Sequence, residues 1–190
     1  MHVIAGSARG RRLLAPKGSA LRPTTGRVKE ALFSILLAQL PGARFLDLFA
    51  GTGAVGIEAL SRGAGHVTFV ESESASCRLL RQNVSQCGFD RVAGIHQTRV
   101  ETYLRGPRTS ATPFDLVFAD PPYDAVSPDD VLSSLAGSDI LTPHTTVIIE
   151  HASNASVPAQ VGCLVRRRQY RYGDSSLTRY TVFQEGPLAP

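Results

Sequence analysis

Hydrophobic and polar positions follow two periods along the chain, one typical of buried strands and the other of amphipathic helices. Short apolar runs such as RFLDLF and TTVIIE alternate with stretches in which apolar residues recur every three or four positions. We expect strands at 44–49, 66–71, 92–96, 114–119 and 145–150, and helices at 26–39, 54–62, 73–87, 99–105 and 127–136. This rhythm predicts an α/β fold with a doubly wound, mostly parallel sheet.

The two ends of the chain depart from that rhythm. Residues 2–5 and 11–15 flank a glycine-containing turn, which predicts a small N-terminal β-hairpin. Residues 163–171 and 176–183 flank a turn-rich link and predict an antiparallel hairpin. We therefore expect an N-terminal extension of residues 1–24, a main domain of residues 25–185 and a tail of residues 186–190.

Charge separates the extension from the main domain. The first 29 residues contain seven Lys or Arg and no Asp or Glu, although the whole chain has a net charge of only +4. A basic segment on a nearly neutral body is typical of proteins that bind a polyanion, and a solvated arm is the alternative. The candidate phosphate-binding residues are Arg9, Arg11, Arg12, Arg22, Thr24 and Arg27.

Composition restricts the cellular setting. The three cysteines form no CxxC pair, so reduced thiols are expected and a metal site is not. The first residues lack the apolar core of a signal peptide, and no apolar run reaches the length of a membrane span. We expect a soluble, cytoplasmic protein without a membrane partner.

A glycine-rich turn follows the first strand of the main domain. In DLFAGTGAVG, Gly51 and Gly53 begin a GxGxxG pattern, which lets backbone N–H groups approach a ligand at a helix start. Glu71 ends the next strand, where an acid accepts hydrogen bonds from ribose hydroxyls. The pattern favours a nucleoside-containing cofactor over a plain tight turn, and NAD, FAD and S-adenosylmethionine all remain possible.

The sequence DPPY follows the predicted strand at 114–119 and indicates a specific chemistry. Asp120 and the carbonyl of Pro121 can each accept one N–H bond of an exocyclic base amine, which aims its lone pair at a methyl donor. Pro121 and Pro122 make the backbone rigid, and Tyr123 offers a ring on which a base stacks. In such a reaction, alignment of the amine with the methyl donor provides most of the rate acceleration. The motif favours methyl transfer to a base nitrogen over a simple Pro-Pro turn.

A second basic cluster, RRRQYRYG, occupies residues 166–173. Its mixture of Arg and Tyr suits a surface on which bases stack. Because strand side chains alternate between faces, only part of the cluster can address one ligand. An ordinary charged edge strand is an equally good interpretation.

Five motifs together resemble one known family. RGRRLLAP, LRPTTGRVKEALFSIL, DLFAGTGAVGIEALSRGA, DPPY and RYGDSSL are similar to the RsmD family, bacterial methyltransferases that modify guanine N2 in 16S ribosomal RNA. The resemblance implies a seven-stranded sheet whose last strand is antiparallel, and an N-terminal hairpin that contacts RNA. It also implies S-adenosylmethionine as cofactor and the small ribosomal subunit, or its assembly intermediate, as substrate.

The resemblance also assigns roles by position. Asp120, Pro121, Pro122 and Tyr123 would hold the target guanine. The cofactor would be lined by Asp47, Phe49, Gly51, Gly53, Glu71, Ser72, Thr98, Arg99, Val100 and Asp120. Arg99 stands where such enzymes often carry an acidic or amide residue near the adenine, so backbone groups are expected to serve there. Gly26 likewise replaces an expected acid.

Three alternatives remain open. DPPY also suits adenine-N6 methylation of DNA, but 190 residues leave no room for a separate target-recognition domain. An NAD-type oxidoreductase would use the glycine loop and leave DPPY and the basic segment unexplained. A non-catalytic RNA-binding module is the third. We expect a monomer.

Overall fold

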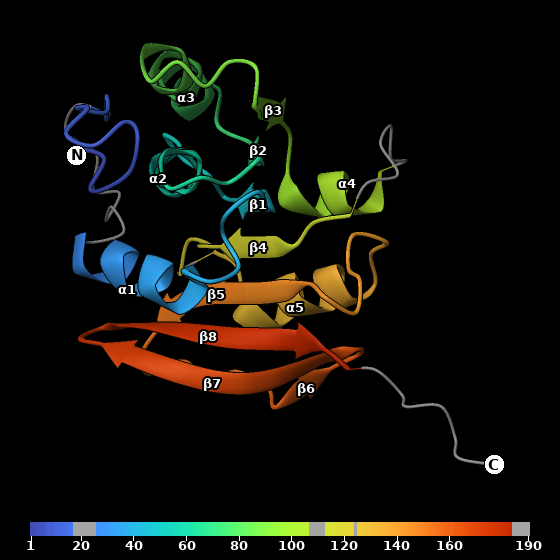
Figure 1. Cartoon of the computed structure of the whole chain (residues 1–190). Coiled ribbons are helices and arrows are strands. Elements are labelled where there is room, and N and C mark those ends of the chain that lie inside the picture. Colours follow the sequence, from blue (N-terminus) through green and yellow to red (C-terminus); the bar gives the residue numbers. More distant parts are fainter. Residues whose placement is uncertain (17–25, 107–112, 124, 184–190) are drawn as a thin grey trace.

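The computed structural model describes residues 1–16, 26–106, 113–123 and 125–183 (Figure 1). Its centre is an eight-stranded sheet with the order β3-β2-β1-β4-β5-β8-β7-β6. The strands are β1 (Arg44–Leu48), β2 (His66–Glu71), β3 (Ala93–Gln97), β4 (Leu116–Ala119), β5 (Thr146–Ala152), β6 (Gln160–Val161), β7 (Leu164–Tyr172) and β8 (Ser175–Val182). The helices are α1 (Gly26–Leu36), α2 (Ala54–Ser61), α3 (Ser74–Gln86), α4 (Val100–Arg105) and α5 (Pro128–Ala136).

The sheet combines a parallel half and an antiparallel end. Strands β1 to β5 are parallel, whereas β8 pairs antiparallel with β5, β7 with β8 and β6 with β7. The chain order reverses between β1 and β4, because β2 and β3 extend the sheet on one side and β5 on the other. In open α/β sheets ligands bind at such a switch point, outside the carboxyl ends of the strands.

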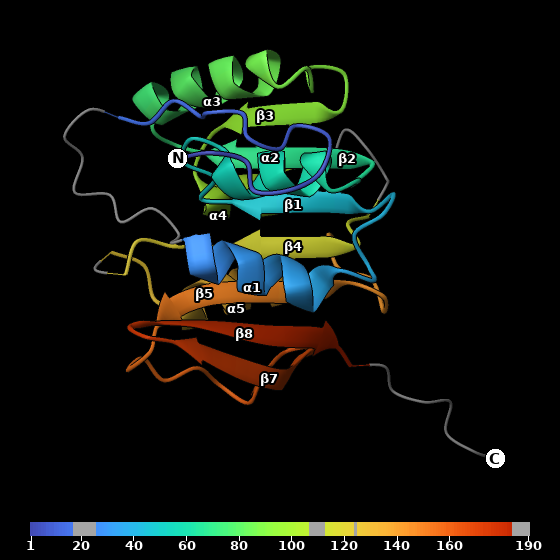
Figure 2. The ribbon, with the colours of Figure 1, turned by 60° about the vertical axis from the view of Figure 1, so that its left-hand side comes forward.

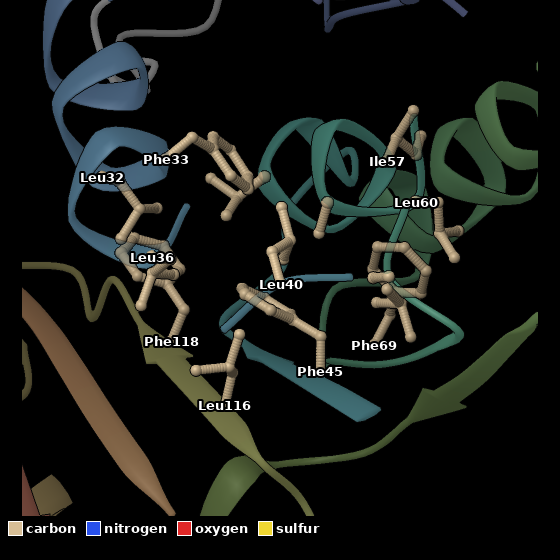
Figure 3. Close-up of a cluster of buried hydrophobic side chains, with 14 of the residues drawn as sticks. Leu32, Phe33, Leu36, Leu40, Phe45, Ile57, Leu60, Phe69, Leu116 and Phe118 are labelled. Atoms are coloured by element: carbon tan, nitrogen blue, oxygen red, sulfur yellow. The ribbon is translucent and has the colours of Figure 1, made fainter. Parts of the chain in front are cut away.

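Helices cover both faces of the sheet, which is why the central strands are mostly apolar. One hydrophobic cluster joins the sheet to α1, α2 and α3, and a second joins it to α4 and α5. Figure 3 shows the first cluster, which includes Leu32 and Phe33 of α1, Ile57 of α2, Phe45 of β1 and Phe118 of β4. Among the described residues, no helix has both the length and the apolar content needed to cross a bilayer.

The predicted doubly wound fold is confirmed, with two local corrections. Seven strands were expected and the sheet has eight, because the two-residue strand β6 pairs with the start of β7. A two-residue strand leaves no periodic signal in the sequence. The expected N-terminal hairpin contains a single antiparallel bridge, His2 to Arg12, in place of two strands.

The reason for the short hairpin is a buried acid on α2. Glu58 is fully buried, and its carboxylate accepts hydrogen bonds from the N–H groups of Ile4 (2.8 Å) and Ala5 (2.9 Å). Lys29 Nζ lies 3.0 Å and Arg62 Nε 2.8 Å from the same carboxylate. Burial opposes ionisation, but the hydrogen bonds from Ile4, Lys29 and Arg62 and the charge of Lys29 lower the pKa of Glu58. The backbone groups that would extend the hairpin ladder are thus used to hold residues 1–16 on the domain.

Candidate functional site

The glycine loop follows β1 and the DPPY turn follows β4, and these two strands are neighbours that end at the same level. Leu48, the last residue of β1, pairs with Ala119, the last residue of β4, and the N–H of Asp120 lies 3.4 Å from the carbonyl oxygen of Leu48. Both segments therefore begin side by side at the carboxyl edge of the sheet, as the sequence predicts. This edge is at the left of Figure 2.

Positive φ angles shape the glycine loop. Phe49 has a φ of 59°, Gly51 of 55° and Gly53 of 84°. Phe49 is the only residue other than glycine with positive φ among the described residues. Such a conformation costs on the order of 1 kcal/mol or more, and backbone strain of this kind is concentrated at functional sites.

The glycines serve two different purposes. A Cβ on Gly53 would lie 2.2 Å from Leu80 Cδ1, and one on Gly56 would lie 2.2 Å from Phe69 Cε1, so both allow α2 to pack closely. A Cβ on Gly51 would meet no atom within 4 Å. The loop therefore presents bare backbone to open space at Gly51, where a nucleoside cofactor can approach it.

Glu71 borders the same loop. Its two carboxylate oxygens accept the N–H of Gly51 at 2.7 Å and the N–H of Glu73 at 2.7 Å. Each carboxylate oxygen has two lone pairs, so the group retains acceptor capacity for ribose hydroxyls. The sequence-predicted position of this acid fits a cofactor that carries a ribose.

Asp47 lies beneath the loop and is only 2% exposed. Its Oδ2 accepts the N–H of Gly56, in the first turn of α2, at 2.8 Å. Burial raises the pKa of Asp47 to about 7; the hydrogen bond from Gly56 opposes this rise and the nearby Glu71 carboxylate adds to it. Asp47 thus fixes the start of α2 from below the loop.

The residues expected near the adenine gather beside Glu71. Glu71 pairs with Gln97 at the ends of β2 and β3, and the N–H of Thr98 donates to the carbonyl of Glu71 at 3.0 Å. Ser72 and Arg99 are exposed, whereas Val100 is buried and begins α4. The structure thus brings the predicted cofactor residues together at one edge.

The DPPY turn is rigid and partly open. Pro121 is buried and Pro122 is exposed. The carbonyl of Pro122 accepts the N–H groups of Ala125 (3.0 Å) and Val126 (3.1 Å). No backbone N–H in the described part of the chain donates to the carbonyl of Pro121. Pro121 thus lies buried at this edge, beside the half-buried Asp120.

Two residues that the sequence interpretation missed hold Tyr123 in place. The hydroxyl of Tyr123 lies 3.2 Å from Glu150 Oε1 and 3.1 Å from Ser175 Oγ, although 38% of the residue is exposed. Burial of the phenol and the neighbouring carboxylates raise the pKa of Tyr123. The ring is thus anchored at its hydroxyl and neutral at ordinary pH. The available signal was an acid at the end of an apolar strand, in TVIIEHA.

The candidate RNA-binding arginines do not all lie at the carboxyl edge of the sheet. Arg9, Arg11, Arg12 and Arg27 are exposed, and Arg22 and Thr24 lie outside the described residues. Ser7 and Ala8 bond to Ser61, the last residue of α2, so the turn that holds Arg9 lies toward the amino edge. Arg27, in the first turn of α1, is closer to the carboxyl edge (Figure 2).

A buried amide connects the basic segment to the glycine loop. Asn83 of α3 is fully buried; its Oδ1 accepts the N–H of Leu14 at 2.7 Å, and its Nδ2 donates to the carbonyls of Leu14 (3.0 Å) and Thr52 (2.9 Å). Gln86 Nε2 donates to the carbonyl of Arg12 at 2.8 Å. The chain after the hairpin is thus fixed beside the loop. The sequence interpretation did not identify either amide.

Comparison with known proteins places these features in context. The family model described as conserved hypothetical protein 95 matches residues 1–181. The chain is 34% identical over 180 residues to the putative rRNA methyltransferase YlbH of Bacillus subtilis, covering 95% of this chain and 98% of that protein. It is 36% identical over 152 residues to ribosomal RNA small subunit methyltransferase D of Haemophilus influenzae, covering 79% and 78%. The solved structure of the putative methyltransferase yhhF from Escherichia coli matches with a TM-score of 0.83 and 30% identity, covering 96% and 97%.

Proposed function

This chain belongs to the family described as conserved hypothetical protein 95, the RsmD family, and we propose that it methylates N2 of a guanine in 16S ribosomal RNA. The methyl donor is S-adenosylmethionine. One observation carries the proposal. The glycine loop follows β1 and the DPPY turn follows β4, and the paired residues Leu48 and Ala119 end these strands side by side. A cofactor held by the loop and a base held by the turn are therefore neighbours.

The cofactor fits the loop as the structure presents it. Gly51 faces open space, Glu71 keeps acceptors for a ribose, and Asp47 holds the loop from below. S-adenosylmethionine supplies a methyl group that is already activated on a sulfonium. The protein therefore needs to position the acceptor and exclude competing geometries, and strong base catalysis is not required.

The DPPY turn positions the acceptor. Asp120 and the carbonyl of Pro121 accept the two N–H bonds of the guanine amine, which directs its lone pair toward the donor. Tyr123, anchored by Glu150 and Ser175, stacks against the base. Asp120 accepts the proton that the amine loses after transfer. The same turn suits an adenine amine, so adenine-N6 methylation of DNA is the alternative that the experiment must exclude.

The RNA target follows from the relatives and the charge. Two relatives are named as ribosomal RNA methyltransferases, one of them for the small subunit. The proposal assigns residues 1–24 to an RNA-contacting extension and 25–185 to the methyltransferase domain; residues 17–25 and 184–190, which include the expected tail at 186–190, lie outside the described residues. The substrate is the small subunit or its assembly intermediate, and the enzyme acts as a cytoplasmic monomer.

The test is methyl transfer from radiolabelled S-adenosylmethionine, with small subunits from a strain that lacks this protein or with duplex DNA as acceptor. Label should enter only 16S rRNA, and mass mapping should place it on a guanine N2. Asp120→Ala should lower kcat about 100-fold with an unchanged Kd for S-adenosylmethionine. Asp90→Ala removes an exposed acid at the amino edge and should leave kcat unchanged. Label that enters only DNA, or equal activity of the Asp120 and Asp90 variants, contradicts the proposal.

A further inference from the structure

Strand β7 carries a row of exposed arginines beside the candidate site. Arg166, Arg167, Arg168 and Arg171 are all exposed. In the described part of the chain, β6 is the only strand beyond β7, and it pairs with Leu164 and Val165. The N–H of Arg166 donates to the carbonyl of Ala159, and from Arg167 onward no strand pairs with this edge of β7 among those residues. Among the described residues the ion pairs are Lys29–Glu58 and Arg62–Glu58, so no arginine of β7 is paired with a carboxylate there.

Cross-strand pairs show which of these side chains share a face. Tyr170 pairs with Leu177, which belongs to the hydrophobic cluster under α1, and Tyr172 packs against the same cluster. By alternation Arg168 lies on this face too, with its guanidinium 5.0 Å from the Tyr170 ring centroid. Arg167 donates from Nε to Thr181 Oγ1 at 2.7 Å. Thr181 lies four residues after Leu177 in β8, so the two side chains are on the same face. We call the set of Arg167, Arg168, Tyr170 and Tyr172 the β7 strip.

The register of β7 and β8 places two positive charges side by side. Arg168 is directly opposite Arg179 in the β7–β8 register. Like charges in such a pair are destabilising. Arg179 Nε is also buried without a hydrogen-bond partner among the described residues. A phosphate placed beside the two guanidinium groups would offset the repulsion between them.

The strip leads directly to the candidate site. Tyr172 pairs with Ser175, and Ser175 Oγ lies 3.1 Å from the hydroxyl of Tyr123. From Tyr172 to Arg168 the strand extends about 13 Å, at roughly 3.3 Å per residue. In Figure 2, β7 lies at the lower edge of the sheet, away from α1.

We propose that the β7 strip binds the rRNA strand that continues from the methylated nucleotide, with phosphates at Arg167 and Arg168 and a base stacked on Tyr170. Paired stacking and phosphate contacts are how proteins hold single-stranded RNA. Charges that only protect an edge strand from aggregation need no aromatic neighbour and no continuity with a catalytic turn. The inference rests on the proposed rRNA methylation.

The experiment compares two variants with the same loss of charge. Arg167→Ala/Arg168→Ala removes the strip's cations, and Arg91→Ala/Arg105→Ala removes two exposed arginines near the amino edge. The strip variant should raise KM for small subunits about 10-fold. It should also lower the slope of log affinity against log salt by about 1.4, at roughly 0.7 for each of the two phosphate contacts, with kcat and the Kd for S-adenosylmethionine within about twofold of wild type. The control should match wild type in every measurement.

Tyr170 provides a second, uncharged variant. Tyr170→Leu should raise KM about 5-fold without changing the salt slope, and Tyr170→Phe should restore it. Equal KM values for the two double arginine variants contradict the proposal that the β7 strip binds rRNA. Weaker binding to intact subunits with unchanged binding to deproteinised 16S rRNA also overturns it, because the contact is then with a ribosomal protein. Failure of the wild-type enzyme to label subunits contradicts the proposed function itself.

Discussion

The two turns at the carboxyl edge are built in opposite ways. The glycine loop works through side chains that are absent: Gly53 leaves room for Leu80 of α3, Gly56 lets α2 approach Phe69 of β2, and Gly51 exposes backbone. The DPPY turn works through groups that are present, namely a carboxylate, a carbonyl and an anchored ring. Substitutions in the loop should therefore change folding and cofactor affinity, whereas substitutions in the turn should change turnover.

The largest expected effect is at Gly53. Its φ is 84° and a new Cβ would lie 2.2 Å from Leu80 Cδ1, so Gly53→Ala combines left-handed strain with overpacking. We expect a loss of about 3 kcal/mol in the free energy of unfolding, measured with denaturant.

Gly51→Ala is the matched control. It also places Ala at positive φ, but in open space. It should lose only about 1 kcal/mol in stability while binding S-adenosylmethionine at least tenfold more weakly, about 1.4 kcal/mol. If both variants lose equal stability and bind the cofactor equally, the assignment of packing to Gly53 and of cofactor binding to Gly51 is wrong.

Asp47 gives an effect that depends on pH. In the unfolded chain an Asp ionises near 3.8, whereas burial raises the pKa of Asp47 to about 7 in the folded protein. Between these values the unfolded chain has released a proton that the folded protein keeps. The contribution of Asp47 to stability is therefore fully present below pH 4, declines as the pH rises to about 7, and is constant above.

Asp47→Asn should remove that decline. The Asn oxygen can still accept the N–H of Gly56, so the geometry of α2 is retained. Measured by denaturant unfolding, the variant should gain stability relative to wild type between pH 4 and pH 7. A difference that is constant with pH would mean that Asp47 is already ionised in this range.

The sequence predicted the parts of the site that obey local rules. Apolar runs locate the strands, and the ends of parallel strands meet at one edge, so the glycine loop, Glu71 and DPPY could be placed together. Arg9 shows what the sequence cannot predict, because charge alone does not reveal that the turn holding Arg9 lies toward the amino edge of the sheet.

The parts that were missed are contacts between residues far apart in the chain. Glu58 holds Ile4 and Ala5, Asn83 holds Leu14, and Glu150 and Ser175 hold Tyr123. A buried polar residue needs partners, but the sequence does not say where they are. The acid within the apolar helix AVGIEALS was a usable signal that an unpredicted partner would cover it.

The smallest effect is expected at the hydroxyl of Tyr123. Tyr123→Phe keeps the ring and removes the bond to Glu150, so kcat should fall only about threefold and stability by about 1 kcal/mol. Tyr123→Ala removes the stacking surface and should lower kcat at least tenfold more than Tyr123→Phe, measured with small subunits at saturating S-adenosylmethionine. Ser175→Ala removes the other partner of the hydroxyl and should resemble the Phe variant. If the Phe and Ala variants of Tyr123 are equally slow, the hydroxyl itself takes part in the transfer, and the turn acts through more than alignment.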